Sequence, residues 1–283
     1  MLAIHIFNGL VYGALLIVMC SGLALIYGLR RVINFAHGSL YMLGAYVAYT
    51  VATHSNFWVA LIVAPLVMAI VGVCLDRFGF RYLQDRDPLT VVLVTFGLLL
   101  IIEDFVQTVW GKSNLSVPAP GLLDVSVDLF GTPVPAYRIG VIAVGALVAL
   151  GLTAWLRYSS VGLFVRSAST DPVTTAMQGV NTDRLSATVV GLGTALAGLA
   201  GVVAAPFLSL SPSMSSDVLI DSFVVVVIGG LGSLAGAFVA ALLLGQVQAL
   251  GAVYLPELSA VLPFVLMVAV LLWKPAGLAG SRT

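Results

Sequence analysis

Long apolar stretches alternate with short polar ones along most of the chain. Eight stretches suggest membrane-crossing helices, and they cover residues 9–29, 38–54, 57–75, 89–110, 139–156, 185–206, 222–251 and 257–273. A transmembrane helix needs about 20 apolar residues, and these stretches lack the alternation of membrane barrel strands. The pattern predicts an all-α polytopic membrane protein of about eight transmembrane helices, with one or two broken or re-entrant segments. We expect a single domain over residues 1–283.

Composition agrees with a membrane protein and disfavours a soluble enzyme. The chain is 60% hydrophobic and only 8% charged, whereas soluble domains carry about 25% charged residues. Twelve basic residues balance twelve acidic ones, so no basic surface for nucleic acid is expected.

The arginines predict how the chain is oriented in the membrane, because cytoplasmic loops are enriched in basic residues. The arginines that mark the cytoplasmic side are Arg30, Arg31, Arg77, Arg81, Arg86, Arg157, Arg166 and Arg184. The N-terminus and the segments 111–137 and 209–221 are then expected outside. Residues 222–255 are short for two crossings, so either one crossing is short, or the segment is re-entrant, or the C-terminus lies outside.

Two apolar regions are interrupted by polar residues and glycines. The first contains Asn34, His37 and Gly38; the residues of the second are Gly229, Gly230, Gly232 and Ser233. Broken helices survive in lipid only where protein or a water-filled cavity surrounds them, and in transporters they mark the substrate path. We therefore predict that both groups lie beside a translocation pathway. The alternatives are a structural role for His37 and close helix packing for the glycines.

The polar loop 158–184 contains signals for a short helix of its own. Asp171 suits the N-cap and Pro172 the first helical position, and the helix should run to about Gln178. Gly179 suits the position after the helix, and Asn181 or Thr182 can cap the next one. The loop is therefore expected to form a helix–turn–helix elbow on the cytoplasmic side.

No nucleotide or metal site is predicted in this chain. Gly111-Lys112-Ser113 ends like a phosphate-binding loop, but Val106 stands where that motif needs glycine. No spacing of His, Cys and acidic residues suggests a metal. Glu103 and Asp104 are interpreted as an interfacial carboxylate pair rather than a substrate contact.

The elbow resembles the coupling loop of ABC importer permeases, in the form found in the branched-chain amino acid permease family. The matching residues are Arg166, Asp171, Pro172, Ala176, Gly179, Asn181 and Arg184. Ser167 and Val180 depart mildly from the family pattern. Three further stretches are similar in the same order: Ile33 to Gly38 with Met42 to Ala45, Val227 to Ser233 with Gly236, and Trp273 to Leu278, where Lys274 replaces the usual arginine.

The resemblance implies a transport subunit without an ATPase site, in the inner membrane of a prokaryote. The partners it implies are a second permease, often a different one, two ATPase subunits that hold ATP and Mg, and an extracytoplasmic solute-binding protein. The expected solutes are branched-chain amino acids or related small polar molecules. A permease of the sugar-importer type is the alternative. An ion-coupled secondary transporter is disfavoured because few ionisable residues are expected at membrane depth.

Overall fold

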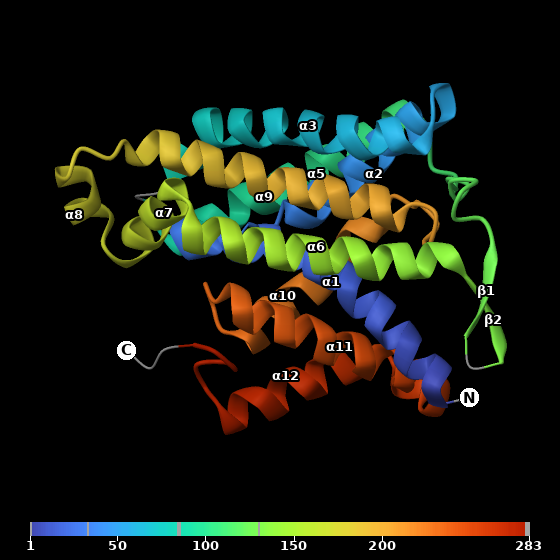
Figure 1. Ribbon diagram of the computed structural model, residues 1–283. Coiled ribbons are helices and arrows are strands. Elements are labelled where there is room, and N and C mark those ends of the chain that lie inside the picture. Colours follow the sequence, from blue (N-terminus) through green and yellow to red (C-terminus); the bar gives the residue numbers. More distant parts are fainter. Residues whose placement is uncertain (1, 33, 84–85, 130, 281–283) are drawn as a thin grey trace.

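The computed structural model describes residues 2–32, 34–83, 86–129 and 131–280 (Figure 1). Its longer helices are α1 (Leu2–Arg30), α2 (His37–His54), α3 (Phe57–Leu75), α5 (Pro88–Trp110), α6 (Ala136–Tyr158), α9 (Thr182–Ala204), α10 (Met214–Gly229), α11 (Leu234–Tyr254) and α12 (Leu262–Trp273). The shorter ones are the π-helix η1 (Asp76–Phe80), α4 (Arg81–Leu83), α7 (Ser160–Thr170), α8 (Pro172–Met177) and the 3₁₀-helix η2 (Pro256–Leu258). The strands β1 (Ser126–Leu129) and β2 (Thr132–Pro135) form an antiparallel hairpin.

The predicted all-α membrane fold is confirmed. Within the described ranges, six helices are long and apolar enough to cross a membrane: α1, α3 continued through η1 and α4 to Leu83, α5, α6, α9 and α11. In Figure 1 the elbow helices α7 and α8 lie at one end of the bundle, together with the C-terminus. The N-terminus and the β1–β2 hairpin lie at the other end. We call these the cytoplasmic end and the outer end, following the predicted orientation.

Helix α1 lies at the centre of the bundle. In its most apolar 18-residue stretch 89% of residues are buried, against 17% in α6 and 28% in α5. Helix α9 packs closely against it: a Cβ atom added to Gly22 would lie 2.3 Å from the carbonyl oxygen of Gly193. Glycine on both helices lets the two backbones meet, as small residues do between helices in membranes. Helices α3, α5 and α6, in contrast, are mostly exposed. Because their exposed faces are apolar, they suit lipid or another subunit.

The predicted span 222–251 is wrong, because the structure divides this region into two helices. Helix α10 starts at Met214, eight positions earlier, so Asp221 lies inside a helix and not in an outer loop. The chain then turns at Gly230, whose φ of 98° favours glycine, and α11 returns toward the outer end. Helix α10 has 16 residues, fewer than the roughly 20 of a full crossing, whereas α11 is long enough to cross, in agreement with the alternative that one crossing is short.

The segment after α12 lies at the cytoplasmic end and completes the turn between α10 and α11. The backbone N–H of Leu278 donates to the carbonyl of Ile228 (2.8 Å), and that of Ala279 donates to the carbonyl of Gly229 (3.1 Å). Sequence alone left the side of the C-terminal part open. These bonds place residues 278 and 279 beside the end of α10, at the end of the bundle that carries the elbow.

The close contact between α1 and α9 yields a stability test. Gly22→Ala adds a Cβ that meets the Gly193 carbonyl, so the helices must separate, and we expect a loss of about 1–3 kcal/mol. The measurement is denaturant unfolding of the chain in detergent micelles. Gly151→Ala in α6 is the matched control, because a Cβ there meets no atom within 4 Å. Equal destabilisation by both changes would contradict the packing argument.

Candidate functional site

The elbow helix α8 begins at a complete N-cap. The Asp171 carboxylate accepts hydrogen bonds from the backbone N–H groups of Val173 and Thr174, each at 3.0 Å, and also from the Thr174 hydroxyl. Pro172 occupies the first helical position, as predicted. The hydrogen bonds from Thr174 hold the pKa of Asp171 below its usual value. The Asp171 carboxylate is therefore fully ionised at neutral pH. Its contribution to the stability of α8 is lost only as the pH falls through that lowered pKa.

Gly179 and Asn181 make the turn that joins α8 to α9. Helix α8 ends at Met177, one residue before the predicted end. Gly179 has a φ of 85°, which residues with a side chain rarely adopt. Asn181, one of the two residues expected to cap α9, accepts the backbone N–H of Arg184 at 2.9 Å. The predicted elbow is confirmed in its local geometry.

The two faces of α8 differ in a way that the sequence did not reveal. Thr175 is buried; its hydroxyl donates to the backbone carbonyl of Asp171 (2.7 Å) and lies 2.9 Å from the Ser167 hydroxyl on α7. On the other side, Val173 and Met177 are 62% and 81% exposed. Helix α8 is thus anchored to α7 and presents an apolar surface outward. The i, i+4 spacing of Val173 and Met177 was the available signal.

Other residues matched by the family resemblance lie around this surface. Arg166 on α7, Ala176 on α8 and Arg184 at the start of α9 are all exposed at the cytoplasmic end. The elbow therefore has an apolar surface on α8 and an exposed arginine on each of the two helices that flank α8.

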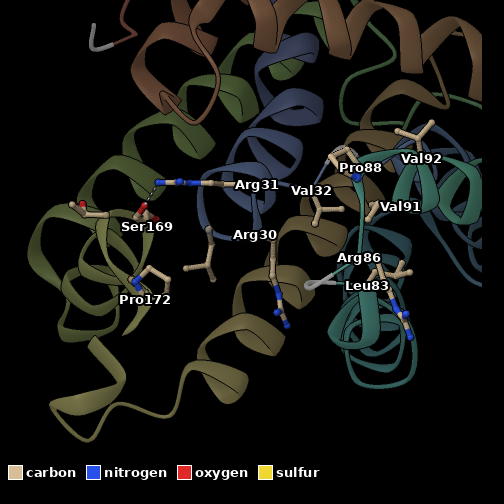
Figure 2. Close-up of a pocket in the computed structure, with 13 residues that line it drawn as sticks. Arg30, Arg31, Val32, Leu83, Arg86, Pro88, Val91, Val92, Ser169 and Pro172 are labelled. Carbon is tan, nitrogen blue, oxygen red and sulfur yellow. Dashed lines mark hydrogen bonds between the residues drawn. The ribbon is translucent and has the colours of Figure 1, made fainter. Parts of the chain in front are cut away.

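A cavity of about 410 Å³ lies beside the elbow (Figure 2). It lies between the end of α1, the start of α5 and the junction of α7 with α8. Arg31 extends across it and donates to the carbonyl of Ser169 at 3.3 Å, and Arg86 lines its opposite wall. From the sequence, these arginines indicated only which end of the bundle faces the cytoplasm. The structure adds that Arg31 connects the central helix to the elbow.

Next to this cavity, Arg30 is held in a buried ion pair. Its guanidinium lies 2.9 Å from the Asp76 carboxylate, and the Ser186 hydroxyl donates to the same oxygen at 2.9 Å. The side chains of Arg30 and Asp76 are 5% and 3% exposed. Breaking one partner of such a pair leaves a buried charge and is strongly destabilising. The pair therefore ties α1, η1 and α9 together at the cytoplasmic end.

The first group predicted beside a pathway lies inside the bundle. Asn34 and His37 are fully buried, and so is Gly38, which packs on Ser215 of α10. The His37 Nε2–H donates to the carbonyl of Met19 (2.9 Å), and the Asn34 side-chain oxygen accepts the N–H of Ala36 (3.0 Å). These contacts hold the turn between α1 and α2. Their role in translocation stays a prediction, and Ile33 lies outside the described residues.

The second group forms the turn between α10 and α11. Gly230 and Gly232 have φ values of 98° and 85°, and the Ser233 hydroxyl caps α11 by accepting the N–H of Gly236. Gly229 packs directly on Gly236, and Gly232 lies against Gly28. The predicted backbone break is thus present. It lies at the cytoplasmic end, near the C-terminal end of α1. In the described ranges, no group of three or more His, Cys, Asp or Glu residues could hold a metal ion.

The chain matches a known family along nearly its whole length. The sequence model described as "Branched-chain amino acid transport system / permease component" matches residues 5–271. The chain belongs to this permease family. No solved structure matches it.

Its relatives include two kinds of permease. LivH of Escherichia coli K12, a "high-affinity branched-chain amino acid transport system permease protein", is 30% identical over 98% of this chain and 94% of its own. BraD of Pseudomonas aeruginosa is 28% identical over 96% of this chain and 94% of its own length. LivM of Escherichia coli K12 is 26% identical over 93% of this chain and 67% of its own length. The chain is therefore a transport component of the membrane.

The N-cap of α8 can be tested by hydrogen exchange. Asp171→Ala removes the acceptor for Val173 and Thr174, and losing an N-cap costs about 0.5–2 kcal/mol. We expect severalfold faster amide exchange in the peptide that contains α8, measured by mass spectrometry at neutral pH. Asp171→Asn is the control, because asparagine caps helices about as well as aspartate. Unchanged exchange in the alanine variant would show that α8 does not depend on this cap.

Proposed function

We propose that this chain is one of two permease subunits of an ATP-driven importer for branched-chain amino acids or related small polar solutes. Membership in the permease family supports the class of solute. The observation that carries the proposal is the elbow: a capped short helix whose Val173 and Met177 are exposed outside the apolar bundle. A permease that worked alone would gain nothing from this surface, whereas an ATPase subunit with a complementary groove would bury it.

The elbow is connected so that movement of α8 would reach the centre of the bundle. Thr175 ties α8 to α7, and Arg31 ties the end of α7 to the end of α1. Helix α9 follows the elbow directly and packs on α1, α2 and α3. When two ATPase subunits close on ATP, a push on α8 would therefore tilt α9 against α1. That tilt is our proposed source of alternating access.

The remaining partners follow from the same proposal. The second permease is a paralogue of this chain, which the similarity to both LivH and LivM supports. ATP and Mg bind the ATPase subunits and not this chain. An extracytoplasmic binding protein delivers the solute to the outer end, and the complex sits in the inner membrane of a prokaryote.

Dependence on ATPase subunits is the direct test of this function. In proteoliposomes, we expect leucine uptake only when the permease pair, the ATPase subunits, ATP and the loaded binding protein are all present. The permease alone should hydrolyse no ATP. Flux through the lone chain that follows an ion gradient would instead favour a secondary transporter. ATP-driven uptake of sugars without amino acids would favour the sugar-importer type.

The coupling role of the elbow can be tested at Gly179. Gly179→Val places a β-branched residue at a φ of 85°, which costs about 1–3 kcal/mol and should misdirect α8. We expect a folded complex whose ATP hydrolysis no longer responds to the loaded binding protein. Gly179→Asn is the control, because asparagine adopts positive φ more readily and a Cβ here meets no atom within 4 Å. Full stimulation and normal uptake with valine would exclude the elbow from coupling.

A further inference from the structure

A carboxylate in the middle of the bundle is held by donors from two other helices. Tyr12 on α1 donates its hydroxyl to Oδ2 of Asp221 at 2.6 Å, and Gln248 on α11 donates its side-chain N–H to Oδ1 at 3.0 Å. Asp221 itself is on α10 and is 9% exposed. The three residues come from distant parts of the chain, so the network forms only when the bundle is assembled.

This carboxylate lies at membrane depth. Helix α10 starts at the outer end, where the Ser215 hydroxyl donates to Glu103 near the end of α5. It reaches the cytoplasmic end, where Gly232 in the following turn lies against Gly28 of α1. Asp221 is in the middle of this 16-residue helix, about 10 Å along the axis from its start. An acidic side chain at that depth is costly, and such residues mark the paths of solutes and ions.

No cation within the described ranges neutralises Asp221. The ion pairs found there join Arg30 to Asp76 and Arg81 to Asp183. The nearest charge on α10 is another acid, Asp217, one turn toward the outer end, which repels Asp221 electrostatically. The two carboxylates therefore attract positive charge from outside the chain.

A buried hydroxyl without a partner lies near Tyr12. Tyr41 on α2 is fully buried, and its hydroxyl makes no hydrogen bond in the described structure. It is close enough to Tyr12 to interact with it electrostatically. Each carboxylate oxygen of Asp221 can accept a second hydrogen bond. Asp221 can thus accept two of the three N–H groups of a primary ammonium.

A polar cavity lies at the outer end of α10, on the side of the bundle from which a solute would enter. This cavity of about 480 Å³ is lined by Ser213 and Ser216 of α10, by Glu103 of α5 and by Lys112 in the segment after α5. Asp217 follows Ser216 directly and is exposed, and Asp221 lies one turn further in. A helix face with exposed serine and aspartate does not suit lipid. This face of α10 therefore borders water or another subunit.

We propose that Asp221, positioned by Tyr12 and Gln248 and preceded by Asp217, is an intramembrane subsite for the ammonium group of a zwitterionic amino acid. The subsite rests on the proposed function and adds to it the class of solute. Ammonium-bearing solutes are favoured over neutral amides and over carboxylic acids that lack an amine. Tyr12 and Gln248 are positioning residues, and Asp221 makes the contact.

Uptake by the reconstituted complex separates charge from hydrogen bonding. Asp221→Asn keeps the size and can still accept the Tyr12 hydroxyl, but it loses the charge. We expect leucine uptake to fall about tenfold or more, since hydrogen bonds to charged groups are the stronger ones. Stimulation of ATP hydrolysis by the loaded binding protein should persist. Tyr12→Phe should cost less, and Asp104→Asn, on the exposed outer part of α5, should cost nothing. Wild-type uptake by Asp221→Asn, or an equal loss with Tyr12→Phe, would overturn the subsite.

A binding measurement distinguishes failure of the subsite from failure of the proposed function. Saturation-transfer NMR on the full chain in nanodiscs needs no ATPase partner. We expect transfer to leucine from the wild type and from Asp104→Asn, and none from Asp221→Asn. The neutral 4-methylpentanamide and the anionic 4-methylpentanoate should give none with any variant. No leucine signal from the wild type, or an equal signal from Asp221→Asn, would overturn the subsite even where ATP-driven uptake is present.

Discussion

A chain within hydrocarbon can leave helical geometry only where other protein groups replace the lost backbone hydrogen bonds. Both interruptions in this bundle obey that constraint. After α1, the Asn34 side chain accepts a hydrogen bond from the N–H of Ala36. After α10, the N–H groups of Leu278 and Ala279 donate hydrogen bonds to the carbonyls of Ile228 and Gly229. The turn after α10 lies at the cytoplasmic end, whereas the turn before α2 lies deeper in the bundle, where His37 meets Met19 in the middle of α1.

Features with a local cause could be predicted from the sequence. Most long spans follow from apolar length. The cap at Asp171 and the glycine turn at Gly179 depend on neighbours within four residues, and the structure has both. The turn at Gly230 also has a local cause, because several glycines close together disfavour a continuous helix. Roles in coupling and translocation are not settled by this geometry and stay predictions.

Features with a distant cause could not be predicted. The serines and the two aspartates between Ser209 and Asp221 indicated an outer loop, yet α10 begins among them. Asp221 is tolerated in a helix because Tyr12 and Gln248 reach it from other helices, and no local pattern announces that contact. The same holds for Arg30, whose partner Asp76 is on another element. In a mostly apolar chain, a few polar contacts between helices thus decide where a span starts.

The hydrogen bonds from residues 278 and 279 also bear on how the protein is made. The carbonyls of Ile228 and Gly229 are synthesised well before the N–H groups that pair with them. During insertion, α11 and α12 must both be in place before the segment after α12 can return to the end of α10. Until then the turn between α10 and α11 has unpaired carbonyls at the cytoplasmic surface. A chain that ends before Leu278 therefore leaves these two carbonyls without the N–H groups that pair with them in the complete structure.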